Sequence, residues 1–232
     1  MVFDKEDYVG KFDIGDNFTR KNVVVYARNA AWDIAKRAGL RYFIELDDDY
    51  TNFFLREPKG DVLKSHRPNN LDVIFDAFIE FLENTPRVSS IAMAQGGDYI
   101  GGVDNDIFTS LNRKRKLMNV YFNATDRPYP FCGRINEDTN TYVHLGKTGT
   151  LFLTHPSAHI TQLMTQSNGG GLTEFYLETG TYVKSFYTVL YNPSAVEIRV
   201  MGESHLRLHH HVKWEYAVPK IIREKHKKGK NN

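Results

Sequence analysis

The chain has 232 residues, of which 41% are hydrophobic and 25% are charged, a composition that predicts a globular protein with one sizeable core. The formal net charge of +2 excludes a polycation, and the single cysteine, Cys132, excludes an intrachain disulfide framework. No apolar stretch is long enough to span a membrane, and the N-terminus lacks the charged-then-apolar order of a signal peptide. These observations predict a soluble, cytoplasmic protein.

The first predicted elements follow one another in an α/β order. Residues 22–26 contain three β-branched valines and fit either a short strand or an extended approach to a helix. Asn29 is a suitable N-cap for a helix through Ala38, which Gly39 would end. A buried strand over residues 41–46 comes directly after this helix. A helix followed at once by a buried strand is typical of an α/β domain.

The later elements continue this pattern. A second helix is predicted from the N-cap Asn70 to Thr85, because apolar residues recur at helical spacing until Pro86. A third helix is predicted over 172–184, after the glycine-rich loop 167–171. Further strands are predicted over residues 88–94, 116–123, 148–154 and 187–190. No internal repeat divides the chain, which is therefore predicted to form one α/β domain over residues 1–219 and a basic tail over residues 220–232.

Three consecutive carboxylates, Asp47, Asp48 and Asp49, follow the strand predicted over 41–46. Like charges so close together are unfavourable unless a cation or hydrogen-bond donors compensate them. In an extended segment Asp47 and Asp49 would point the same way and Asp48 the other. Two carboxylates on one side can hold a hard divalent ion that keeps open positions for phosphate oxygens. The alternative is an acidic turn, where aspartate is common.

Two other segments carry groups suited to the same chemistry. Arg28, near the start of the first predicted helix, would pair either with a diphosphate or with the acidic triplet itself. Glu137 and Asp138 form an acidic pair at the head of a possible helix. Either the helix dipole favours them there, or one of them accepts a proton from an attacking hydroxyl group.

A histidine cluster, His209-His210-His211, lies far along the chain. In a regular strand these three side chains cannot all face one ion, but one or two of them can. Neutral imidazole suits Mn²⁺ and other transition ions better than Mg²⁺. The alternative is a histidine-rich surface or a loop that contacts the acceptor.

The order of these motifs along one α/β domain resembles the nucleotide-sugar-dependent glycosyltransferases of the GT-A fold. The run from Ala27 to Asp49 is especially close to that pattern. Within the fold, the chain is most similar to the TET-associated DNA glycosyltransferases of bacteriophages, which are related to the glucosyltransferase that completes base J. The matching segments are residues 91–101, 133–138, 209–210, Trp214 and 219–221.

The resemblance implies a GT-A-like (Rossmann-like) mixed sheet flanked by helices. It also implies transfer of a sugar from a nucleotide sugar, with UDP-glucose as the expected donor, to the hydroxyl of a 5-hydroxymethylpyrimidine in DNA. Mn²⁺ or Mg²⁺ would be the cofactor, and Asp138 or Glu137 would be the catalytic base. The implied metal ligands are Asp47, Asp49, His209 and His210. The implied donor contacts are Arg28, Asn29, Asp47, Asp48, Gly96 and Gly97.

Basic residues are expected to hold DNA through its phosphates. They are Arg113, Lys114, Arg115, Lys116, Lys213, Lys220 and Arg223. For both basic segments the alternative is a solvated helix end or a frayed tail, and for the tail alone this alternative is favoured. Because a base inside a duplex is hard to reach, we expect a single-stranded substrate or a flipped nucleotide.

One departure from the family pattern concerns the N-terminus. The strand and loop that open such domains, and that hold the nucleotide base, have no counterpart in the segment after Met1. The sequence therefore predicts either an N-terminally incomplete chain or a separate chain that supplies this unit. Two other function classes stay open: a metal-dependent nucleotidyltransferase and a non-catalytic DNA-binding or scaffold protein. If the gene belongs to a phage, the expected compartment is the host cytoplasm.

Overall fold

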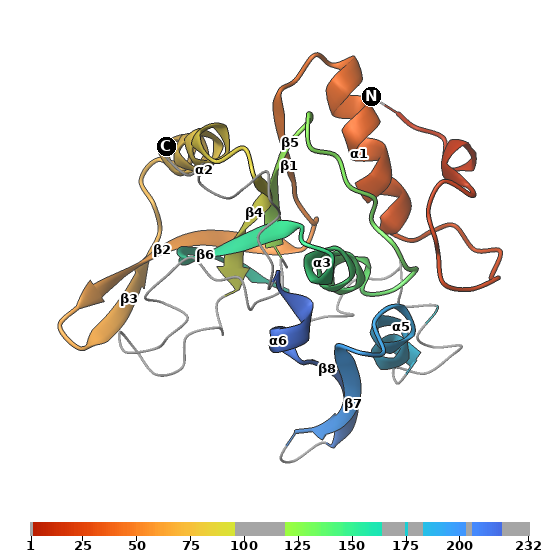
Figure 1. Ribbon diagram of the computed structural model, residues 1–232. Helices are drawn as coiled ribbons and strands as arrows, with labels where there is room; N and C mark the ends of the chain where they lie inside the picture. The colour runs from red at the N-terminus through yellow and green to blue at the C-terminus, as the bar shows by residue number, and fades with distance from the viewer. Residues whose placement is uncertain (1, 96–118, 164–174, 176–182, 203–205, 220–232) are drawn as a thin grey trace, which may run out of the picture.

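The computed structural model describes residues 2–95, 119–163, 175, 183–202 and 206–219 (Figure 1). Helical elements are a short 3₁₀ turn, Glu6–Tyr8, and α1 Val25–Arg37, α2 Leu71–Asn84, α3 Glu137–Lys147, α5 Val183–Tyr191 and α6 Trp214–Ala217. Strands are β1 Tyr42–Glu45, β2 Tyr50–Lys59, β3 Val62–His66, β4 Val88–Gln95, β5 Asn119–Ala124, β6 Leu151–Gln162, β7 Val196–Met201 and β8 Arg207–Val212. Among the described residues, no helix is long and apolar enough to cross a membrane.

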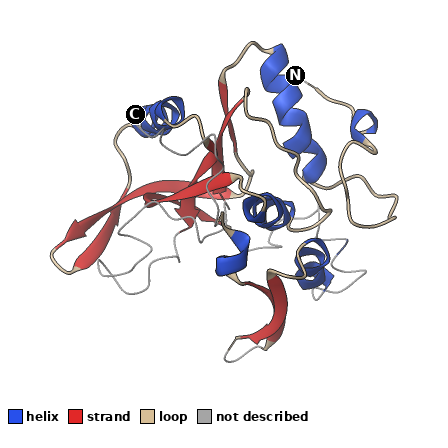
Figure 2. Ribbon diagram, viewed as in Figure 1, coloured by secondary structure: helices blue, strands red, loops and turns tan. Residues whose placement is uncertain are grey.

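Six strands form the central sheet in the order β1-β5-β4-β6-β2-β3. The β4–β6 pair is parallel and the other four pairs are antiparallel, so the sheet is mixed. Helices lie on both sides of this sheet, and the separate β7–β8 hairpin lies beside α5 (Figure 2). The predicted α/β class, a Rossmann-like mixed sheet flanked by helices, is confirmed.

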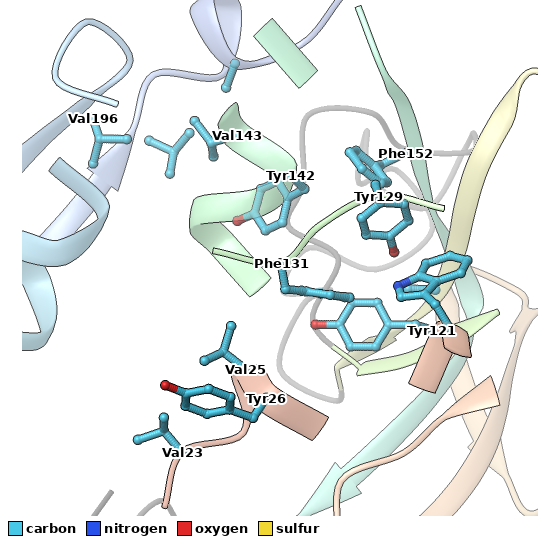
Figure 3. Packing of buried hydrophobic residues seen from close by; sticks show 14 of the residues in the cluster. Val23, Val25, Tyr26, Tyr121, Tyr129, Phe131, Tyr142, Val143, Phe152 and Val196 are labelled. Atoms are coloured by element: carbon cyan, nitrogen blue, oxygen red, sulfur yellow. The ribbon is translucent and has the colours of Figure 1, made fainter. Parts of the chain in front are cut away.

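Each face of the sheet buries its own hydrophobic core. Side chains alternate along β5, so that Tyr121 packs into one core and Phe122 into the other. The first core joins α1, the segment around Phe131, and α3, and Figure 3 shows how its aromatic rings interlock. The second core joins α2 to the other face, where Phe78 stacks on Phe122 with the ring centroids 4.5 Å apart. Apolar side chains on both faces fix β1 and β5 between two layers of helices.

Local signals predicted α2 and β4 well. Asn70 caps α2 as predicted, because its side chain accepts a hydrogen bond from the Asp72 amide at 2.9 Å. The helix ends before Thr85, as the following proline requires. The predicted strand over 88–94 is β4.

Two local predictions are wrong. The strand predicted over 187–190 lies within α5, because packing against β7 and β8 overrides the β preference of its β-branched and aromatic residues. The N-cap predicted at Asn29 lies inside α1, which begins at Val25. The Asn29 side chain instead binds the backbone of Phe131 twice, donating to its oxygen at 3.0 Å and accepting from its nitrogen at 3.0 Å.

Candidate active site

The acidic triplet lies in the turn between β1 and β2, directly after the strand predicted to precede it. Asp47 and Asp49 are half-buried, and Asp48 is exposed. The backbone turns at Asp48 and Asp49, so the triplet is not an extended segment, and the shared orientation of Asp47 and Asp49 stays a prediction. The position at the end of β1 fits both alternatives for the triplet, a metal site and an acidic turn.

Arg28 meets the triplet from α1. Its guanidinium is buried, at 5% exposure, and contacts three carboxylates: Asp47 at 2.6 Å, Glu45 at 3.4 Å and Glu137 at 3.5 Å. The guanidinium also lies 4.8 Å above the Tyr121 ring, whose neighbour Phe131 is visible beside it in Figure 3. We call Arg28 and its three carboxylates the Arg28 cluster. It joins the end of β1 to the start of α3, segments about 90 residues apart in the sequence.

The Arg28 cluster places three carboxyl groups around one guanidinium. Burial raises the pKa of Glu45 to about 8, although Arg28 opposes this shift. Burial, with the charge of Asp138, raises the pKa of Glu137 to about 7. Burial and the charges of its two aspartate neighbours also raise the pKa of Asp49. One guanidinium is therefore not enough to keep all of these carboxyl groups ionised, and a cation bound beside them would favour their ionised forms.

Neutral hydrogen-bond donors hold two of the carboxylates in place. The Tyr50 hydroxyl donates to Asp47 at 3.2 Å, on the oxygen that Arg28 does not bind. The Asn123 amide donates to Glu45 at 3.1 Å. These contacts fix the orientation of both carboxyl groups.

The acidic pair Glu137 and Asp138 begins α3, as predicted. Asn136 comes just before it in the left-handed conformation, with φ of 54°, and its amide donates to the carbonyl oxygen of Lys184 at 2.8 Å. Glu137 is buried against Arg28, whereas Asp138 is half-buried. Burial raises the pKa of Tyr121, and the charge of Asp138 raises it further, which places Asp138 near the same cluster.

The predicted histidines lie on β8. His210 is buried, with its Nδ1 3.4 Å from the Asn136 amide nitrogen, and the His209 ring lies 4.3 Å from the His210 ring. The described part of the chain contains no group of three or more His, Cys, Asp or Glu residues placed to hold a metal ion. The structure thus brings His210 next to Asn136, which precedes Glu137. Metal binding by His209 and His210 stays a prediction.

Sequence reasoning missed a second buried arginine, Arg134. Its guanidinium donates to Asp16 at 2.7 and 2.8 Å, to the Phe18 carbonyl oxygen at 2.8 Å and to the Arg20 carbonyl oxygen. The Tyr187 hydroxyl donates to the same Asp16 carboxylate. We call Arg134, Asp16 and Tyr187 the Arg134 cluster. Local sequence contains no signal for it, because its members lie 118 and 171 residues apart.

The other predicted site residues either have a different partner or lie outside the described residues. Lys213 is described, and its ammonium pairs with Glu197 at 2.5 Å. The remaining donor-binding and nucleic-acid candidates lie outside the described residues: Gly96, Gly97, Arg113, Lys114, Arg115, Lys116, Lys220 and Arg223.

Residues 1–171 match a family model described as TET-associated glycosyltransferase. The chain belongs to this family. All four members of the Arg28 cluster, and Asp138, lie within the matched residues, whereas β8 and its histidines follow them. The family is one of glycosyltransferases, so the Arg28 cluster is the candidate active site of a sugar-transferring enzyme. No curated protein and no solved structure matches the chain.

Proposed function

We propose that this TET-associated glycosyltransferase moves a sugar, glucose in the first instance, from a nucleotide sugar to the hydroxyl of a hydroxymethylated pyrimidine in DNA. Asp47 and Asp49 are assigned to the donor diphosphate, and Asp138 to the acceptor. The observation that carries this proposal is the contact of Arg28 with both Asp47 and Glu137, at 2.6 and 3.5 Å. One guanidinium thereby connects the predicted donor carboxylates to the predicted acceptor pair.

The donor side has the chemistry that a hard divalent ion prefers. Burial and the charges of Asp47 and Asp48 raise the pKa of Asp49, and a cation that binds between these carboxylates relieves their mutual repulsion. Mg²⁺ or Mn²⁺ held by one or two carboxylates completes its coordination with water and substrate phosphates, so a larger protein cage is not required. Such an ion would neutralise the charge that develops on the leaving nucleoside diphosphate.

Arg28 takes the second of the two roles that the sequence leaves open, because it pairs with the acidic triplet through Asp47. At 5% exposure and with three carboxylate partners, it is poorly placed to bind a diphosphate directly. It instead fixes Asp47 and Glu137 relative to each other. Precise positioning of this kind lowers the barrier because the reacting groups are already oriented.

Asp138 is better suited than Glu137 to accept the proton of the attacking hydroxyl. Glu137 is buried against Arg28, whereas Asp138 is half-buried and can reach a bound acceptor. A base of this kind must come within hydrogen-bond reach of the proton that it removes. The acceptor base would have to leave the DNA stack to approach it, which favours single-stranded or flipped substrates.

The test is transfer of glucose from UDP-glucose to a single-stranded oligonucleotide that contains 5-hydroxymethylcytosine, with Mn²⁺ present. We expect glucosylated DNA and UDP from the wild type, and a large loss of both in Asp49→Ala. Asp126→Asn is the matched control, because that exposed carboxylate pairs only with its neighbour Arg127 among the described residues. Equal activity in wild type and Asp49→Ala would refute the metal assignment, and release of pyrophosphate would indicate a nucleotidyltransferase.

A further inference from the structure

A hydrogen-bond relay leads from the backbone of β5 to Asp47. The Val120 amide donates to the Tyr50 hydroxyl oxygen at 3.4 Å, and that hydroxyl donates to Asp47 at 3.2 Å. Because the phenol oxygen accepts from Val120, its own proton is directed toward the carboxylate. Hydrogen bonds in such a chain polarise one another and strengthen the last member.

A β-bulge makes the first donor of this relay available. In the β4–β5 ladder, Ala92 pairs with Tyr121 and Met93 pairs with Asn119, so Val120 is the extra residue. The β1–β5 ladder ends at Tyr121 and also leaves Val120 without a strand partner among the described residues. Bulges recur beside active sites, where they redirect backbone or side-chain groups.

The backbone at Val120 is unusual for its residue type. Its φ of 53° is in the left-handed region, which β-branched residues rarely adopt, and the side chain is fully buried. Such conformations persist where the surroundings enforce them, and they concentrate at functional sites. Here the conformation accompanies an amide that is directed at Tyr50 and not into the sheet.

We propose that Tyr50 is a positioning residue for Asp47, held by the bulge at Val120, and that it sets the affinity of the donor site for its divalent ion. Arg28 binds one oxygen of Asp47 and Tyr50 binds the other, so the carboxylate cannot rotate. Each oxygen keeps a lone pair for the ion. The inference rests on the proposed metal-dependent donor site.

The test compares Tyr50→Phe with Tyr42→Phe. Both tyrosines are half-buried and pack against the α2-side core, so each substitution removes one hydroxyl from a similar environment. Only Tyr50 contacts Asp47 through its hydroxyl. Electron paramagnetic resonance of Mn²⁺, titrated in the presence of UDP, gives the metal dissociation constant of each full-length variant.

We expect a dissociation constant for Mn²⁺ about 10- to 100-fold higher in Tyr50→Phe, the range typical for loss of a group that orients a metal ligand. Tyr42→Phe should match the wild type. Excess Mn²⁺ should restore most of the kcat of Tyr50→Phe, which a general structural defect would not allow. In an Asp47→Asn background, Tyr50→Phe should have no further effect on Mn²⁺ binding.

The outcomes separate this inference from the proposed function. Wild-type Mn²⁺ affinity in Tyr50→Phe, equal losses in the two tyrosine variants, or an additive loss in the double variant would each overturn the role of Tyr50 and leave the donor site standing. A wild type without UDP-dependent Mn²⁺ binding would overturn the metal-dependent donor site, and the inference with it.

Discussion

The Arg28 and Arg134 clusters are both built on a buried arginine, and they balance its charge differently. Arg134 is fully buried and donates to one carboxylate and two backbone carbonyl oxygens. Although burial opposes the effect, hydrogen bonds from Arg134 and Tyr187 hold the pKa of Asp16 below its ordinary value. Arg28 meets three carboxylates, and two of these have raised pKa values.

This difference distinguishes a structural ion pair from a site prepared for a ligand. In the Arg134 cluster every charge has its partner within the fold, and removal of one member leaves an uncompensated buried charge. In the Arg28 cluster two of the three carboxyl groups have raised pKa values, and we propose that a bound ligand compensates them. Groups with perturbed pKa values that gather in this way are typical of functional sites.

The largest expected effect is on activity, at Asp138 beside the Arg28 cluster. Asp138→Asn should lower kcat for transfer to hydroxymethylated DNA by about 10²- to 10⁴-fold, the usual contribution of a positioned base. Mn²⁺ affinity should be unchanged. Steady-state kinetics with the exposed-site variant Asp126→Asn as control tests this. A normal kcat in Asp138→Asn would assign the base to Glu137 or to another group.

The second effect is on stability, at the Arg134 cluster. Asp16→Asn should lower the free energy of unfolding by about 3 kcal/mol, because Arg134 loses its only carboxylate partner among the described residues. Urea unfolding measures this change. Asp13→Asn, a nearby exposed position, should change stability by less than about 0.5 kcal/mol. Equal stability in Asp16→Asn and wild type would mean that the cluster is not a structural ion pair.

The third effect is a pH dependence that is opposite in the two clusters. Raised pKa values mean that folded Glu45 and Glu137 keep protons that the unfolded chain releases, so their contribution to stability is lost as pH rises from about 4.5 toward 8. The lowered pKa of Asp16 means that its contribution is lost only in acid, as pH falls below about 4.

Between pH 5 and pH 8 the free energy of unfolding of the wild type should therefore fall by about 1–3 kcal/mol more than that of Glu137→Gln. Urea unfolding at several pH values measures this difference. Glu80→Gln, at an exposed position on α2, is the control and should follow the wild type. Parallel curves for all three proteins would show that Glu137 is ionised throughout this range.

The smallest expected effect is on the stability of Asp47→Asn, which is compared with that of Asp16→Asn. Asp47→Asn should change the free energy of unfolding by no more than about 1 kcal/mol, because Glu45 or Glu137 can ionise and replace it as the charged partner of Arg28. Thermal unfolding without added metal measures it. A loss near that of Asp16→Asn would show that Arg28 and Asp47 form a structural pair, and the contrast between the clusters would fail.

Local patterns predicted the parts of the fold and site that neighbours in sequence determine. The apolar run before Asp47 forms β1, and the pair Glu137 and Asp138 begins α3. The helical spacing after Asn70 gives α2. In each case the signal lies within about one turn or one strand of the feature, where side-chain period and capping act.

Contacts between distant segments were not predictable in this way. Nothing near Arg134 indicates Asp16 as its partner, and nothing near Asn29 indicates the Phe131 backbone. The hairpin of β2 and β3 was missed as well, because its strands carry charged residues at an exposed edge of the sheet. Arg28 was predicted near Asp47, but its burial between three carboxylates depends on α3, which lies much later in the chain.

The position of β2 in the sheet affects how the chain folds during its synthesis on the ribosome. One edge of β2 pairs with β3 at once, but the other pairs with β6, where Tyr50 meets Gln162. At about 5–20 residues per second, roughly 5–20 s pass before that partner is synthesised. During this interval Phe53 and the open edge of β2 have no cover from β6, and exposed strand edges are sites of aggregation. The nascent chain should therefore depend on chaperones most between the synthesis of β2 and that of β6.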